Sequence, residues 1–231
     1  MAASVAAQVA AVRAELQTRP RGLLHHVERV LAEALDLGAR WDLNPERVAL
    51  AVWGHDLFRS FPDSEQLRLA RETGVPVGAA EAASPVLLHG PIAAVVLRER
   101  FAVTDDEALQ AVRAHTLGAP AMPLIAKVIL IADKVEPRKR ARTPLMRAVR
   151  RLARRDLNLA LLCWADWKWV EECQAGWPSH PGHWEARQRW VTEHHIDRQP
   201  RQGPMTELAS REERPTGAGG PGRPGGWSIR C

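Results

Sequence analysis

A histidine–aspartate pair and one distant aspartate are the residues of this chain best placed to bind a metal. His55 and Asp56 follow an apolar helical stripe that includes Val52, so both are expected to face the interior. Asp133 ends the apolar run 128–132 and shares its face. A carboxylate in such a position costs roughly several kcal/mol unless a cation lies beside it. The sequence therefore predicts a metal ion, or an Arg or Lys side chain, next to Asp133.

A further histidine comes from the helix expected before this pair. At about 100° per residue, the apolar stripe of that helix is centred near Val27 and Ala34. His26 lies at the margin of the stripe and His25 on nearly the opposite side, so His26 is the inward candidate. Histidine nitrogens combined with carboxylate oxygens suit iron, manganese or zinc.

The elements that would position these residues are helices. Apolar spacing predicts one over about 20–37, and Asn44 with Pro45 caps a second that leads into His55. Thr104 and Glu107 have the capping-box spacing. Further helices are expected over 90–100, from 104 to near 115, over 123–135, from 144, and from 156 to near 176. Because alternating apolar and polar runs are nearly absent, the expected fold class is all-α.

In their order along the chain, these residues resemble the HD-domain metal-dependent phosphohydrolases. The strings are closer still to the YqeK-type branch, the symmetrical bis(5'-nucleosyl)-tetraphosphatases. They are HVERV at 26–30, HDLFR at 55–59, LLHGPIAA at 87–94, AHTLGAPAMPLIAKVILIADKVEPRK at 114–139 and RDLNLAL at 155–161. The resemblance covers roughly residues 20–165 and implies an HD-domain helical bundle.

The resemblance also implies a centre of about two divalent metal ions, iron first, with manganese or zinc as alternatives. Its implied ligands are His26, His55, Asp56, His89, His115 and Asp133. Asp56 would bridge the ions, and the metals would lower the pKa of a water that attacks phosphorus. His89 and His115 are expected at the rim of the site. The alternative is that these two only bind substrate phosphates around a single ion.

Three positions depart from the family pattern. Arg59 stands where the family usually has lysine; it is expected to act with Asp56 in catalysis and to bind phosphate, but it cannot serve as a general acid. Ala119 replaces an arginine and Lys134 a tyrosine. The expected substrate contacts are Arg59, Thr116, Arg138 and Lys139.

These residues favour hydrolysis of a nucleotide, first of all symmetrical cleavage of diadenosine tetraphosphate into two ADP. The alternatives are an HD hydrolase of another nucleotide or phosphoester, and a catalytically weak metal- and nucleotide-binding regulatory module.

Four segments are expected: an N-terminal helical segment at 1–19, the HD domain at 20–165, a tryptophan-rich helical extension at 166–199 and a disordered Gly/Pro-rich tail at 200–231. Tryptophans at this density usually bury a helical subdomain or an oligomer interface, and a base-stacking platform is the alternative. The six are Trp164, Trp167, Trp169, Trp177, Trp184 and Trp190.

Composition limits the partners. The net charge of +5 is local, because nine basic residues and no acidic one lie between 138 and 155. A solvated helix face is the first interpretation of this run, with a polyphosphate-facing rim and RNA binding as alternatives. No apolar run approaches the roughly 18 residues that a membrane span needs, and three cysteines cannot form a disulfide framework. We expect a cytoplasmic protein with a nucleotide or dinucleoside polyphosphate as ligand, no membrane or nucleic-acid partner, and a homodimer as an open alternative.

Overall fold

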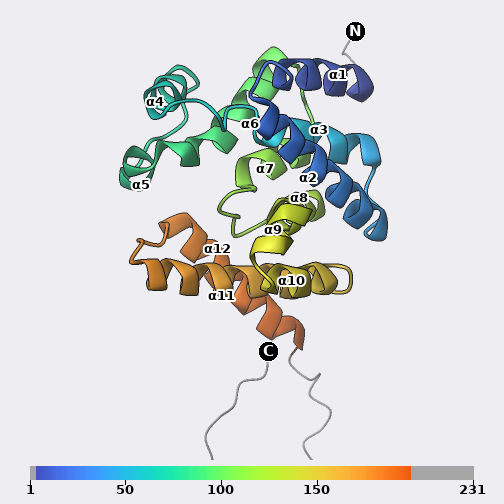
Figure 1. Ribbon diagram of the computed structural model, residues 1–231, viewed down its shortest axis with the longest axis vertical. Coiled ribbons are helices and arrows are strands. Elements are labelled where there is room, and N and C mark those ends of the chain that lie inside the picture. The colour runs from blue at the N-terminus through green and yellow to red at the C-terminus, as the bar shows by residue number, and fades with distance from the viewer. Residues whose placement is uncertain (1–3, 199–231) are drawn as a thin grey trace, which may run out of the picture. The chain divides into compact units, whose positions relative to one another are not determined.

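The computed structural model describes residues 4–198, and the described chain contains helices and no strand (Figure 1). The helices are α1 (Val5–Leu16), α2 (Arg21–Arg40), α3 (Pro45–His55), α4 (Asp63–Glu72), α5 (Ala79–Ala83), the 3-10 helix η1 (Pro85–Leu88), α6 (His89–Arg100), α7 (Asp106–Ala114), α8 (Leu124–Val135), α9 (Pro137–Arg142), α10 (Leu145–Ala153), α11 (Leu157–Ala175) and α12 (Pro181–Arg198). The all-α prediction is confirmed, whereas the tail expected to be disordered lies outside the described residues. Within residues 4–198, no helix is long and apolar enough to cross a membrane.

Helix α8 forms the centre of the core. It is apolar almost all round, and nine of its twelve residues are buried, as expected of a helix that packs on every side. It contacts α2, α3 and α7 as well as α10 and α11, and Figure 1 shows it between these two groups. This packing brings Asp133, near the end of α8, into the interior.

Local capping explains several helix ends. The Asn44 side chain accepts hydrogen bonds from the N–H groups of Glu46 and Arg47 at 2.9 and 3.2 Å, so the predicted start of α3 is confirmed. Asp156 caps α11, which ends at Gly176 with a left-handed φ of 68°, also as predicted.

The predicted start of α7 was wrong by one residue. Asp105, not Thr104, is the N-cap, and its carboxylate accepts from the N–H of Ala108 at 3.1 Å. The same carboxylate binds Arg47 of α3, with Nη2 and Oδ1 2.8 Å apart. This contact with a distant helix adds to the local capping and favours Asp105.

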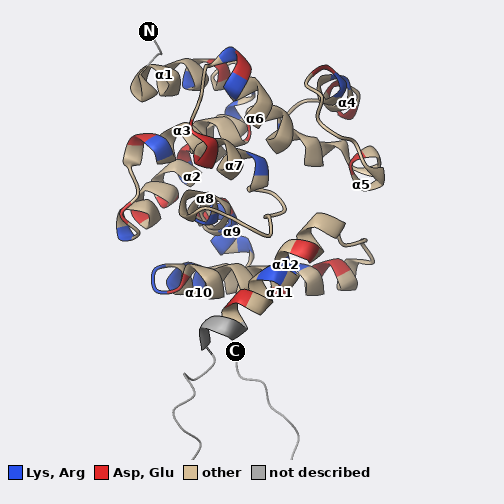
Figure 2. Cartoon of the chain, turned by 180° about the vertical axis from the view of Figure 1, so that it is seen from behind, with Lys and Arg blue, Asp and Glu red and all other residues tan. Residues whose placement is uncertain are grey.

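The basic run packs against acidic residues of α2. Figure 2 shows basic residues on α9 and α10. Arg140 Nη1 lies 2.6 Å from Glu33 Oε2, Arg150 pairs with Glu33 and Asp36, and Arg154 Nη1 lies 2.5 Å from Asp36 Oδ2. These three arginines therefore join the two helices to α2.

The last two helices pack on different parts of the fold. Helix α11 runs across the expected boundary at 165 and packs on α8 and α10. From α12, His183 Nδ1 donates to the carbonyl of Leu117 at 2.8 Å, and Trp190 Nε1 donates to that of Ala119 at 3.1 Å. Gly118, between them, has a φ of 80°. Helix α12 thus holds the 117–119 segment in place.

Candidate metal centre

Three buried histidines are oriented by the same local hydrogen bond. His55 is the last residue of α3, His89 the first of α6, and His115 the C-cap of α7. In each, Nδ1 contacts the carbonyl oxygen three residues earlier, at 2.6 Å for His55 and 2.8 Å for His115. Because a carbonyl can only accept, Nδ1 carries a proton, and in the neutral form of each ring the lone pair is on Nε2. This is the arrangement that orients histidines for metal binding.

The three Nε2 atoms converge on Asp56. His89 Nε2 and His115 Nε2 lie 3.1 and 3.4 Å from Asp56 Oδ1, and His55 Nε2 lies 3.6 Å from Oδ2. The His89 and His115 Nε2 atoms are only 2.9 Å apart. Nε2 of His55 is buried without a hydrogen-bond partner among the described residues.

Such a cluster of histidine nitrogens around a carboxylate suits a cation. Two groups have ligand atoms within 4.8 Å of one another: His26, His55 and Asp56, and Asp56, His89 and His115. Imidazole nitrogens with a shared carboxylate fit first-row divalent metals. The residues present therefore fit the metal expected from the sequence, and Asp56 is common to both groups.

His26 completes the first group from α2. Its Nε2 lies 3.5 Å from Asp56 Oδ2 and 3.1 Å from Asp133 Oδ1. Nδ1 lies 3.8 Å from Glu136, whose carboxylate accepts from Arg29 at 2.7 Å. His25 is exposed, so the prediction that His26 faces inward is confirmed.

Asp133 has cationic neighbours of its own. Lys134 Nζ lies 2.8 Å from Oδ2, and Lys139 Nζ lies 2.6 Å from Oδ1. The buried carboxylate thus has the cation that the sequence requires, and lysines supply it. Asp133 does not belong to either candidate metal group among the described residues. Its contact with the centre is the one between its Oδ1 and His26 Nε2.

Burial sets the protonation of the centre. Desolvation lowers the pKa of His55 and lowers that of His115 to about 3, so both rings are neutral at physiological pH. Burial opposes the charge of Asp56, yet its pKa lies well below the usual value. Burial opposes the charge of Asp133 too, but Lys134 and Lys139 keep its pKa well below the usual value. Neutral rings at His55 and His115 therefore lie beside the ionised carboxylates of Asp56 and Asp133.

The sequence led us to expect His89 and His115 at the rim of the site, and this prediction was wrong. Both are buried next to Asp56. The reason is the close approach of α6 and α7: a β-carbon on Gly90 would lie 2.9 Å from the Val112 carbonyl oxygen and 3.2 Å from His115 Nδ1. Only glycine leaves this space, so the two helix ends that bear the histidines meet inside the protein.

The expected substrate contacts divide into two sets. Thr116 Oγ1 lies 3.1 Å from His115 Nε2, and Lys139 binds Asp133, so both are at the centre. Arg59 and Arg138 are exposed, and neither side chain has a hydrogen bond or ion pair with another residue in the described part of the chain. The Arg59 backbone N–H donates to the Asp56 carbonyl at 3.0 Å, which places the arginine one turn beyond Asp56.

Sequence reasoning missed Glu136 and Gly90. Glu136 is a buried carboxylate that follows an apolar run, so the argument applied to Asp133 could have found it. Its neighbours Arg29 and His26 lower its pKa against the opposing effect of burial. Gly90 stands directly after His89, but no local pattern showed that another helix would pack against it.

Comparisons with known proteins come from sequence and from structure. Proteins named symmetrical bis(5'-nucleosyl)-tetraphosphatase in Bacillus subtilis and in Halalkalibacterium halodurans are each 32% identical over 137 residues, which are 59% of this chain and 72% of either relative. A crystal structure from Clostridium acetobutylicum, described as a predicted HD superfamily hydrolase involved in NAD metabolism, superposes with a TM-score of 0.74 at 25% identity and covers 79% of this chain and 96% of its own. No protein-family model matches the chain.

Proposed function

The chain belongs to the family of symmetrical bis(5'-nucleosyl)-tetraphosphatases, metal-dependent phosphohydrolases of the HD type, and we propose that it cleaves diadenosine tetraphosphate symmetrically into two ADP. One observation carries this proposal within the structure. Three histidines whose Nδ1 atoms donate to backbone carbonyls aim their Nε2 atoms at a single ionised carboxylate.

Two groups of ligands support two ions. His26, His55 and Asp56 would hold one, and Asp56, His89 and His115 the other, with Asp56 shared. Asp133 is proposed as a further ligand of the first ion through its position beside His26. Iron is the first choice, and manganese and zinc suit the same donors. When bound, the metal supplies an activated water at neutral pH and neutralises charge on the phosphoryl oxygens.

The remaining residues provide charge and position. Lys139 and Lys134 keep Asp133 ionised, and they place positive charge beside the phosphate chain. Thr116 offers a hydroxyl next to His115. Arg59, with its exposed guanidinium, would bind an outer phosphate. Attack of water on one of the two central phosphorus atoms breaks its bond to the central bridging oxygen. ADP then leaves as an oxyanion that needs no proton, so the fixed positive charge of Arg59 is sufficient to stabilise it.

Product analysis tests this function. The metal-replete protein is incubated with diadenosine tetraphosphate, and the products are separated by chromatography, alongside a panel of other dinucleoside polyphosphates and mononucleotides. ADP alone is expected, and chelation followed by dialysis should abolish its formation. Formation of ATP and AMP, or preference for another phosphoester, would contradict the proposal. Asp56→Asn should lose metal and turnover together, because one oxygen of the shared carboxylate is replaced by an amide.

Elemental analysis tests the number of ions. The wild type should hold about two ions per chain, and a His89→Ala, His115→Ala double variant that keeps its circular dichroism spectrum should hold about one. A wild type that saturates at one ion, with the double variant unchanged, would reduce these two histidines to phosphate contacts.

A further inference from the structure

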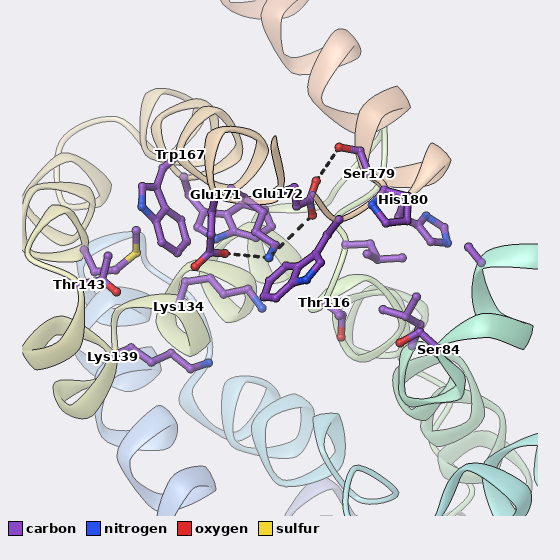
Figure 3. A pocket seen from close by; sticks show the side chains of 18 of the residues that line it. Ser84, Thr116, Lys134, Lys139, Thr143, Trp167, Glu171, Glu172, Ser179 and His180 are labelled. Atoms are coloured by element: carbon purple, nitrogen blue, oxygen red, sulfur yellow. Dashed lines mark hydrogen bonds and ion pairs between the residues drawn. The ribbon is translucent and has the colours of Figure 1, made fainter. Parts of the chain in front are cut away.

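A cavity of about 710 Å³ lies beside the metal centre and is not explained by metal binding. Its volume falls within the range of small-molecule sites. Residues near the metal centre form one part of the wall, and α11 with the segment after it forms the other. Figure 3 shows Lys134, Lys139 and Thr116 on one side, and Trp167, Glu171 and Glu172 on the other.

The first side of the cavity is continuous with the centre. Thr116 Oγ1 lies 3.4 Å from His89 Nε2, and Lys134 and Lys139 both bind Asp133. A phosphate chain held at the centre would therefore extend into the cavity and carry its attached nucleoside with it.

Charge gives the cavity a direction. Near the centre, two lysines face one aspartate, and this excess of positive charge favours phosphate. On the α11 side, Lys168 faces two glutamates, with Nζ 2.9 Å from Glu171 Oε2 and 3.8 Å from Glu172 Oε1. The excess of negative charge there disfavours a second group of phosphates but does not disfavour an uncharged base.

The α11 side presents aromatic surface. Trp164, Trp167 and Trp177 line the cavity. Trp164 is buried and belongs to the core, whereas Trp167 is half-buried and Trp177 is 59% exposed. Trp167 and Trp177 therefore keep indole surface that a ligand can contact. Flat indole rings stack on nucleobases of any kind.

From this arrangement we propose that the cavity binds a nucleoside of the substrate, with its base against Trp167 and Trp177. The inference rests on the proposed function for the phosphate end of the ligand. It assigns to the C-terminal helices the part of recognition that distinguishes a nucleotide from a bare polyphosphate.

Calorimetric titration of metal-free protein with ADP and with pyrophosphate tests the inference without turnover. The wild type should bind ADP more tightly than pyrophosphate. Trp177→Ala, and Trp167→Ala with Trp177→Ala, should reduce the ratio of the two affinities, by about tenfold in the double variant. Trp169→Ala is the matched control, because Trp169 is also on α11 and 41% exposed but does not line the cavity. Trp177 is exposed enough for its single variant to fold if the double variant does not.

Two results would overturn the inference. One is an unchanged affinity ratio in the cavity variants, and the other is a wild type that binds ADP no better than pyrophosphate. Failure of the proposed function is recognised separately: the metal-replete protein would then leave diadenosine tetraphosphate intact, while the ADP titrations of the metal-free protein would still show the effect of the tryptophans.

Discussion

Replacing Gly118 by alanine should destabilise the protein by more than its backbone conformation explains. Gly118 has a φ of 80°, which costs a residue with a β-carbon about 1–2 kcal/mol. The added β-carbon would also lie 2.7 Å from Trp190 Cζ2 and closer still to Cη2. Trp190 is buried and donates to the Ala119 carbonyl, so it cannot move away freely.

Overpacking of this kind costs about 1–3 kcal/mol, which brings the expected loss to about 2–5 kcal/mol. Urea unfolding followed by far-UV circular dichroism measures it. Gly74→Ala is the matched control, because Gly74 has a φ of 67° and nothing lies within 4 Å of its added β-carbon. That variant should lose only the backbone part of about 1–2 kcal/mol.

A double-mutant cycle tests whether the extra loss of stability in Gly118→Ala comes from the Trp190 ring. In a Trp190→Phe background the smaller ring leaves room for the β-carbon, so Gly118→Ala should cost about as much as Gly74→Ala. Equal losses for the two glycine variants in the wild-type background would refute the contact between α12 and the segment that follows His115.

Three further outcomes are expected at the metal centre. Gly90→Ala should weaken metal binding about 10–100-fold in competition with a chelator, because the β-carbon meets His115 and the carbonyl that orients it; an unchanged affinity would show that the ring tolerates the shift. In metal-free protein the pKa of His115 is lowered to about 3, so between about pH 6.5 and 3 the unfolded chain binds more protons than the folded one. The free energy of unfolding from urea titrations should therefore fall by about 2 kcal/mol more between pH 7.5 and 5 in the wild type than in His115→Asn; equal slopes would contradict the buried neutral ring. His26→Ala should lose metal by elemental analysis while His25→Ala keeps it, and the reverse result would show that the first ligand is misassigned.

The sequence alone determined the features that depend on neighbours along the chain. The Asn44 cap, the Gly176 stop and the inward face of His26 follow from local hydrogen bonds and from the helical repeat, and the structure confirms all three. The burial of Asp133 follows from the apolar run before it in the same way. These features need only the geometry of one helix.

Tertiary structure decided which of these groups meet. His55, His89 and His115 come from three helices, and only the packing of α6 against α7 at Gly90 buries the last two beside Asp56. The N-cap of α7 is Asp105 and not Thr104, and Asp105 also pairs with Arg47 of α3. Arginines of the basic run pair with Glu33 and Asp36, which lie more than a hundred residues earlier. Which tryptophans are buried and which line the cavity depends on how α11 and α12 pack against the rest of the fold. Each outcome depends on distances between segments far apart in the chain, which residue periodicity and capping patterns do not contain.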